Sequence, residues 1–153
     1  MIKFFVLFTF FVYSVNANFW SGCFDLPNAI IPTEITSDQC SDTKCIIKRG
    51  EPLMGHVAFT FLKEHEYLKV AVKGTMYGTK IDLYDFKENI CDMIYDKDDN
   101  FFGCPTETDV ESGWKLKFRI SSIFPAYSNA VLRFELKEEN NTEVCFEIIA
   151  DVL

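Results

Sequence analysis

Two histidines are the side chains of this chain best suited to move a proton or bind a metal. His56 and His65 are too far apart to form a metal-binding pair, and neither lies beside a cysteine that we expect to be free. We interpret both as surface or strand-edge residues. No serine lies in a nucleophile-elbow sequence, and no glycine-rich loop could cradle a phosphate. The side chains therefore predict no enzyme, no metal site and no cofactor.

One acidic segment has the spacing of a calcium-binding loop. Its oxygen-bearing residues fall at positions 1, 3, 5 and 12 of that spacing: Asp96, Asp98, Asn100 and Glu107. Phe101 stands where such a loop needs glycine, and no helices are expected on either side. We interpret the segment as a solvated acidic loop.

Six cysteines carry the remaining reactive chemistry: Cys23, Cys40, Cys45, Cys91, Cys104 and Cys145. An even number of cysteines in a secreted chain predicts disulfides, and six cysteines allow 15 pairings among which spacing alone cannot choose. Two pairs are close in sequence and favour local bridges, namely Cys40 with Cys45 and Cys91 with Cys104. That choice would leave Cys23 and Cys145 to join the two ends of the chain.

The first 17 residues have the pattern of a secretory signal peptide. Lys3 precedes an apolar block that is too short to span a bilayer, and small or apolar residues follow it up to Ala17. We expect cleavage after Ala17, which leaves residues 18–153 as one secreted domain of about 136 residues. An oxidising compartment also suits the cysteines.

The charge of the secreted chain limits its partners. Without Lys3 it has 14 basic and 23 acidic residues, a net charge of −9. Nucleic-acid binding needs Lys and Arg to replace phosphate counterions, so we expect none. Anionic membranes attract basic segments, so we expect at most transient contact with membranes.

Alternating apolar and polar residues predict several short β-strands. The inward-facing side chains of these strands are Val57, Phe59 and Phe61; Leu68, Val70 and Val72; Trp114, Leu116, Phe118 and Ile120; and Leu132, Phe134 and Leu136. Turn sequences separate the runs, which predicts an all-β sandwich or barrel of antiparallel sheets. Residues 138–141 are expected to form a hairpin tip, and Asn140-Asn141-Thr142 is an N-glycosylation sequon on it.

The order of these features along the chain is similar to that of a known family. Its marks are Gly22-Cys23, Cys40-x4-Cys45 with a following Lys48-Arg49-Gly50 turn, the Val57-x-Phe-Thr-Phe61 strand, Lys73-Gly74, Cys104-Pro105, Phe124-Pro125 and Cys145-Phe-Glu-Ile148. The whole secreted chain thereby resembles the ML family of lipid-recognition domains, and within it the small soluble Niemann-Pick type C sterol carriers.

The resemblance implies a fold and a binding site. The fold is an immunoglobulin-like β-sandwich of two antiparallel sheets with an internal apolar cavity and three disulfides, Cys23–Cys145, Cys40–Cys45 and Cys91–Cys104. Positions that line the sterol tunnel fall on Leu83, Ile120 and Phe124, with Trp114 and Phe146 near them. We add the inward-facing Phe59, Phe61 and Ile148 to the predicted ligand-binding set. The resemblance also implies that the Cys91–Cys104 loop lies near the tunnel mouth.

The predicted function is a secreted carrier, expected to be monomeric, that holds a sterol or fatty-acid-like lipid between its sheets and transports it without chemistry. Extracellular transport and lysosomal export are both compatible with the sequence. The alternative is a lipid-presenting interaction protein, such as an immune co-receptor or an allergen-like protein, with a receptor or lipid-transfer partner. A lipid hydrolase is a third hypothesis, for which the sequence offers no catalytic group.

Overall fold

The computed structural model describes residues 18–85 and 89–153, so the expected signal peptide at residues 1–17 lies outside the described residues. The elements in chain order are β1 (Trp20–Gly22), β2 (Glu34–Thr36), β3 (Cys45–Ile47), β4 (Pro52–Thr60), β5 (Lys69–Met76), β6 (Thr79–Asp85), the 3-10 helix η1 (Ile90–Met93), β7 (Ile94–Asp96), β8 (Glu111–Arg119), β9 (Tyr127–Glu138) and β10 (Asn141–Val152). Within this part of the chain, no helix is long and apolar enough to cross a membrane.

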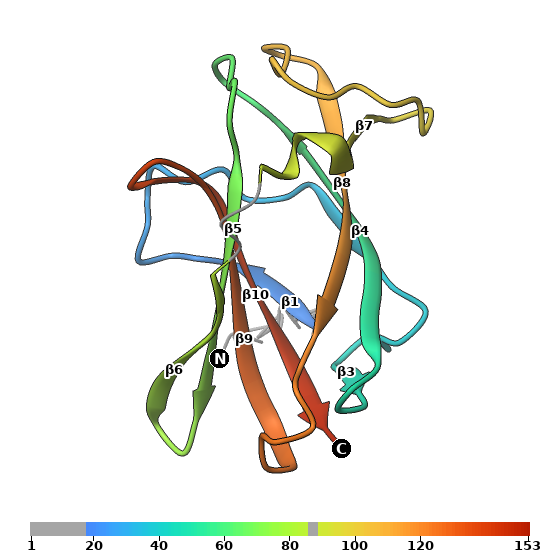
Figure 1. Ribbon diagram of the computed structural model, residues 1–153, viewed down its shortest axis with the longest axis vertical. Coiled ribbons are helices and arrows are strands. Elements are labelled where there is room, and N and C mark those ends of the chain that lie inside the picture. Colours follow the sequence, from blue (N-terminus) through green and yellow to red (C-terminus); the bar gives the residue numbers. More distant parts are fainter. Residues whose placement is uncertain (1–17, 86–88) are drawn as a thin grey trace, which may run out of the picture.

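Two sheets face each other and form the predicted all-β sandwich (Figure 1). The larger sheet has the strand order β1-β10-β9-β5-β6, with β3 also paired to β10. The smaller sheet has the order β2-β4-β8-β7. Each sheet buries one face against the other, which is why the strands alternate between apolar and polar residues.

The strand β8 shows how the sequence produces this arrangement. Trp114, Leu116 and Phe118 are buried between the sheets, whereas Lys117 and Arg119 are exposed. β8 pairs antiparallel with β4 along its whole length, so that Trp114 lies opposite Val57. The alternation predicted from the sequence is confirmed here.

The last two strands form the expected hairpin. β9 and β10 pair from Asn141 with Glu138 to Val152 with Tyr127 and provide the centre of the larger sheet. Glu139 turns the chain with a positive φ of 53°. Asn140, the sequon asparagine, is exposed at the tip.

Three disulfides join the six cysteines in the pairing that the family resemblance implied. Cys23–Cys145 fastens the N-terminal segment to β10 and closes 122 residues of chain, whereas Cys40–Cys45 and Cys91–Cys104 are local. On the loop-entropy estimate the long bridge contributes roughly 4 to 5 kcal/mol to stability.

The short strand β3 departs from a purely antiparallel arrangement. It runs parallel to β10, with Cys45 beside Ala150 and Ile47 beside Val152. The backbone of Leu153 continues the contact, because its N–H donates to the carbonyl of Ile47 at 2.9 Å. The C-terminal end of β10 is thereby fixed between β9 and β3.

The prediction of a surface position is wrong for His65, which is fully buried. Its backbone N–H donates to the hydroxyl of Thr106 at 2.9 Å, and its carbonyl accepts from the N–H of Thr106 at 3.0 Å. Its ring packs on Phe61, with 4.8 Å between the ring centroids. The chain after β4 therefore folds inward, under the segment that contains Thr106. His56, on β4, is half-buried.

Candidate functional site

A pocket of about 450 Å³ lies at one end of the sandwich. Its lining residues come from both sheets and from the turns beside them: Gly50, Leu83, Arg119, Ile120, Ser121, Ser122 and Phe124. Three of these are predicted ligand-binding residues, namely Leu83, Ile120 and Phe124. The volume lies in the range of about 300 to 1,000 Å³ that is usual for small-molecule sites.

The apolar lining residues of the pocket come from both sides of the sandwich. Leu83 is in β6 of the larger sheet, and Ile120 directly follows β8 of the smaller sheet. Ile120 is buried, whereas Leu83 and Phe124 are partly buried and pack against the core. An apolar molecule in this pocket would therefore lie at the entrance to the space between the sheets.

Leu83 can pack against β5 because the residue that it covers there is Gly74, which has no side chain. A Cβ atom on Gly74 would lie 2.8 Å from Cδ1 of Leu83 and 3.6 Å from Cδ2 of Leu132. Two non-bonded carbon atoms prefer a separation of about 3.5 to 4.0 Å, so at 2.8 Å one of them would have to move. The missing side chain at position 74 thus leaves the space that Leu83 occupies.

Phe124 is held by a turn that an arginine fastens. Arg49 donates from Nη1 to the carbonyl of Phe124 at 2.8 Å and from Nε to the carbonyl of Leu153 at 3.0 Å. Next to it, the N–H of Gly50 donates to the carbonyl of Ile120 at 2.8 Å. The turn before β4 therefore positions two lining residues of the pocket.

The rim of the pocket is polar. Arg119, Ser121 and Ser122 are exposed lining residues. Hydroxyl and guanidinium groups can donate hydrogen bonds to a polar ligand atom that stays near solvent. An apolar interior with a polar rim suits an amphipathic ligand.

The other five predicted ligand-binding residues are buried in the core and do not line this pocket: Phe59, Phe61, Trp114, Phe146 and Ile148. Aromatic rings from both sheets form a layer there. Phe134 stacks on Phe146 with centroids 5.1 Å apart, and Trp114 contacts both rings at 6.4 and 6.3 Å. A ligand that went deeper than the pocket would have to separate the sheets at this layer.

Trp114 has one unusual feature within this layer. Its Nε1 is a buried donor for which the described residues provide no hydrogen-bond acceptor. Buried indole N–H groups usually have a partner, because desolvation of an unpaired donor costs free energy. The aromatic layer could therefore also receive a polar ligand atom.

The expected proximity of the Cys91–Cys104 loop to the tunnel mouth is wrong for this pocket. β8 runs the length of the sandwich, with the loop before it at one end and the turn that contains Phe124 at the other (Figure 1). The loop is held locally instead. Asp96 accepts hydrogen bonds from the N–H groups of Asp98 and Asn100 at 2.9 and 2.8 Å. Hydrogen bonds from Asn100 lower the pKa of Asp96 below its ordinary value.

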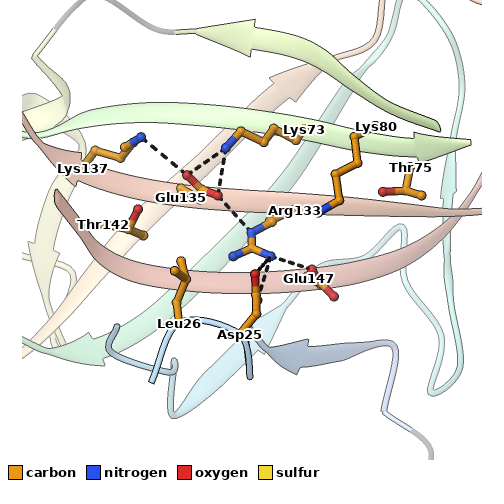
Figure 2. A pocket seen from close by; sticks show the side chains of 10 residues that line it. All are labelled: Asp25, Leu26, Lys73, Thr75, Lys80, Arg133, Glu135, Lys137, Thr142 and Glu147. Atoms are coloured by element: carbon orange, nitrogen blue, oxygen red, sulfur yellow. Dashed lines mark hydrogen bonds and ion pairs between the residues drawn. The ribbon is translucent and has the colours of Figure 1, made fainter. Parts of the chain in front are cut away.

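A second pocket, of about 330 Å³, lies on the outer face of the larger sheet and is charged (Figure 2). Glu135, only 3% exposed, accepts from Arg133 Nε at 2.9 Å and from Lys73 at 3.2 Å. Arg133 also donates to both carboxylate oxygens of Asp25, at 2.8 and 2.9 Å, and this hydrogen bond lowers the pKa of Asp25.

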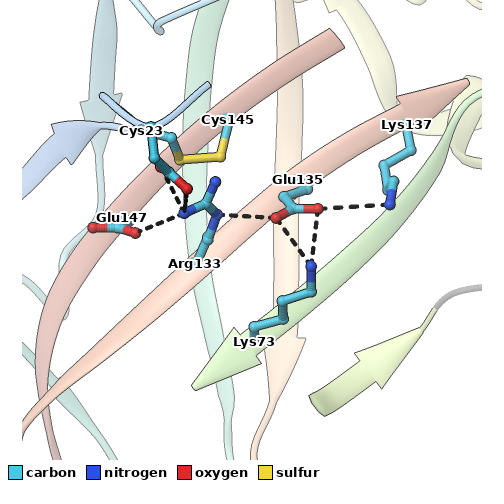
Figure 3. A network of polar contacts seen from close by, with 8 residues as sticks. Cys23, Lys73, Arg133, Glu135, Lys137, Cys145 and Glu147 are labelled. Carbon is cyan, nitrogen blue, oxygen red and sulfur yellow. Dashed lines mark hydrogen bonds and ion pairs between the residues drawn. A yellow bond between two sulfur atoms is a disulfide. The ribbon is translucent and has the colours of Figure 1, made fainter. Parts of the chain in front are cut away.

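These ion pairs neutralise one another, and Leu26 is the one apolar side chain among the described lining residues. Figure 3 shows the network beside the Cys23–Cys145 disulfide, where it ties the N-terminal segment to β9 and β10. We assign it a structural role.

The sequence pattern of the ML domain matches residues 17–152. The chain belongs to the ML domain family. Members of this family are lipid-binding domains without enzymatic activity, so this chain is a binding protein.

Individual relatives are distant. The mite group 2 allergen Eur m 2 from Euroglyphus maynei is 25% identical over 101 residues, which are 66% of this chain and 64% of the allergen. The ML domain described here therefore spans just under two thirds of that relative's length.

A solved structure shares the fold. A Niemann-Pick type C2 protein from the Japanese carpenter ant aligns with a TM-score of 0.65 at 21% identity, over 82% of this chain and 93% of the ant protein. Chicken MD-1 complexed with lipid IVa aligns with a TM-score of 0.49 at 13% identity, over 85% of each chain.

Two residues that shape the pocket of this ML domain were not predicted from the sequence. The sequence predicts a turn at Lys48-Arg49-Gly50 and another at Lys73-Gly74, and neither pattern indicates a role in a pocket. Gly74 instead lies inside β5. A glycine within a strand is a sign of close approach by another group, and that signal could have identified the position.

Proposed function

We propose that this ML domain is a carrier for a sterol or fatty-acid-like lipid, which it binds with the apolar part inward through the pocket at Leu83, Ile120 and Phe124. The observation that carries this proposal is a pocket of about 450 Å³ whose apolar lining residues, Leu83, Ile120 and Phe124, belong to the hydrophobic core or pack against it. The pocket on the outer face of the larger sheet is lined mainly by charged side chains that pair with one another, with Leu26 as its apolar lining residue.

The energetics support an affinity in the micromolar to nanomolar range. A ligand that buries about 400 Å² of apolar surface gains about 10 kcal/mol at about 25 cal/mol/Å². Lost translational freedom and chain ordering cancel a large share of this gain. A hydroxyl or carboxylate buried without a partner would cost several kcal/mol, so the polar end belongs at the rim with Arg119, Ser121 and Ser122.

The pocket also defines how deep the ligand reaches. Since the aromatic layer is closely packed without a ligand, entry beyond the pocket requires the sheets to move apart. β9 and β10 are held by long pairing, whereas β6 is an edge strand of the larger sheet, paired only with β5. We propose that β6, with Leu83, is the element that moves.

A fluorescence competition experiment tests the pocket. The variant Ile120→Phe fills it, and we expect the affinity for a fluorescent sterol and a fluorescent fatty acid to fall by at least tenfold, about 1.4 kcal/mol. Ile149→Phe is the matched control, because Ile149 is 40% exposed on β10 and does not line the pocket. Wild-type affinity of Ile120→Phe for both ligands would overturn the proposed site.

The disulfides indicate the compartment in which the protein would carry its ligand. The three disulfides suit an oxidising, extracellular compartment. We propose secretion after removal of residues 1–17, transport of the lipid in extracellular fluid, and glycosylation at the exposed Asn140. Lysosomal delivery is the second destination that the proposal allows.

One observation favours a lipid-presenting role as a second candidate. Ile123, in the turn beside the pocket, is 87% exposed. An exposed apolar side chain at the mouth of a lipid site could contact a receptor or a membrane during hand-off. Loss of receptor capture or of lipid transfer in Ile123→Ser, with unchanged lipid affinity, would distinguish such a contact from simple carriage.

A further inference from the structure

A buried histidine and two carboxylates meet at the other end of the sandwich from the lipid pocket. His65 lies between β4 and β5, Glu138 ends β9, and Glu143 is in β10. β9 has 12 residues and spans roughly 40 Å, so this cluster is remote from the turn that precedes β9 and lines the pocket. In the described part of the chain, these three residues are the one such group whose donor atoms could share a metal ion.

The donor atoms of the three residues lie close together. Nδ1 of His65 is 3.3 Å from Oε2 of Glu138, and Nε2 is 3.8 Å from Oε2 of Glu143. One ligand atom from each residue can be chosen so that all three lie within 4.8 Å of one another. Ligands about 2.0 to 2.2 Å from a tetrahedral zinc ion are about 3.3 to 3.6 Å apart. Because the two carboxylates lie beside different ring nitrogens, one of them must turn towards the nitrogen that binds the ion.

The imidazole of His65 is 0% exposed, and both of its ring nitrogens are buried. Within the described residues their polar neighbours are the carboxylates of Glu138 and Glu143, at 3.3 and 3.8 Å, and neither contact meets the geometry of a hydrogen bond. Buried polar groups are nearly always partnered, so an exception calls for an explanation such as a bound ion. The ring cannot turn to solvent, since Thr106 holds the backbone of His65 and Phe61 packs against its ring.

A lysine ammonium now occupies the solvent side of the cluster. Nζ of Lys63 is 3.2 Å from Oε2 of Glu138 and 3.0 Å from Oε1 of Glu143. Its side chain is 53% exposed, so it can leave along its flexible stem. The two carboxylates carry a charge of −2 and the ammonium balances one of these charges, whereas a divalent cation in its place would balance both.

We propose that His65, Glu138 and Glu143 form a zinc-binding site, in which one imidazole nitrogen and two carboxylate oxygens bind the ion after Lys63 has moved aside. Three protein ligands leave a fourth position for water. A mixed nitrogen and oxygen donor set with imidazole favours zinc over calcium, which takes oxygen ligands. The ion would fasten the β4–β5 connection to the β9–β10 hairpin.

Zinc titration by calorimetry, with Co²⁺ absorption as the geometric readout, tests the site on secreted protein without a polyhistidine tag. We expect one zinc ion per chain. Glu138→Gln and Glu143→Gln should each weaken zinc affinity by at least roughly 10- to 100-fold. Loss of an outer-shell partner already weakens a metal site by this amount. Lys63→Ala should tighten binding, because it removes the competing cation.

His56→Gln is the matched control, because the chain has only two histidines. It should keep wild-type zinc affinity. The two glutamine variants keep the size of the side chain and answer the question even if His65→Gln fails to fold. Three results would each overturn the proposal. The wild type could fail to bind zinc at millimolar concentration, both glutamine variants could retain binding, or His56→Gln could abolish it.

Discussion

Arg49 donates a hydrogen bond from Nη1 to the carbonyl oxygen of Phe124 at 2.8 Å, across 75 residues of sequence. The same guanidinium also binds the carbonyl of Leu153, so one side chain fixes the pocket turn and the end of β10 together. The shape of the pocket at Leu83, Ile120 and Phe124 therefore depends on a residue that does not line it.

Arg49→Lys tests this dependence. Lysine keeps the charge but cannot reproduce the fork that reaches both carbonyls. We expect the free energy of unfolding in urea to fall by about 1 kcal/mol, with weaker lipid binding because the Phe124 turn loosens. Arg119→Lys is the control for stability: Arg119 is exposed, so this variant should stay within about 0.5 kcal/mol of the wild type. Equal stability of the two variants would contradict the role given to Arg49.

Gly74→Ala tests the packing of Leu83. The new methyl group would lie 2.8 Å from Cδ1 of Leu83 and push that side chain towards the pocket. Because Leu83 is only partly buried and its terminal methyl group can turn aside, we expect a stability loss of about 1 kcal/mol, the lower end of the range for overpacking, together with weaker lipid binding.

The double variant with Leu83→Ala is the internal control for Gly74→Ala. Since the smaller residue removes the clash, the stability loss of the double variant should be less than the sum of the two single losses. Strict additivity in a double-mutant cycle would mean that the two residues are not coupled.

Ile123→Ser separates binding from hand-off. The side chain is 87% exposed, so its replacement should leave both stability and lipid affinity close to the wild type. Transfer of a fluorescent sterol to neutral phosphatidylcholine vesicles should slow several-fold, because the apolar contact at the pocket rim is lost. Unchanged transfer rates would exclude Ile123 from the contact surface.

The ion pair of Asp25 with Arg133 makes a pH prediction. The hydrogen bond from Arg133 lowers the pKa of Asp25 below the ordinary value of 3.8 in the folded protein. A group with a lowered folded pKa stabilises the protein above its unfolded pKa and loses this effect as the pH falls through the folded pKa. Asp25→Asn should therefore be less stable than the wild type at pH 7.

Urea unfolding of both proteins at several pH values provides the measurement. The stability difference should persist in mildly acid solution and shrink only below 3.8. A difference that disappeared already between neutral and mildly acid pH would point to another group, and an increase on acidification would contradict the direction of the pKa shift.

Much of the fold was predictable because each strand has one buried face. The run from Trp114 to Ile120 alternates so regularly that its burial follows from the sequence, and β8 confirms it. The parallel pairing of β3 with β10 was not predictable, since a three-residue strand carries too little pattern to specify a partner. The burial of His65 also escaped prediction, because it depends on Thr106, 41 residues away.

The candidate site shows the same division. Leu83, Ile120 and Phe124 came from the family resemblance and line one pocket. Phe59 and Ile148 were added from alternation, which identifies an inward face but cannot distinguish a pocket wall from a packed core; both residues are buried in the core. Arg49 acts through a hydrogen bond to backbone, for which no side-chain pattern exists.

Native mass spectrometry of the secreted protein, followed by organic extraction and identification of bound molecules, tests the carrier proposal most directly. We predict a sterol or fatty acid at near one-to-one occupancy, and its loss in Ile120→Phe but not in Ile149→Phe. A wild-type protein that is isolated empty and also takes up neither fluorescent sterol nor fluorescent fatty acid would contradict the account, and would indicate a filled core with a role in partner binding.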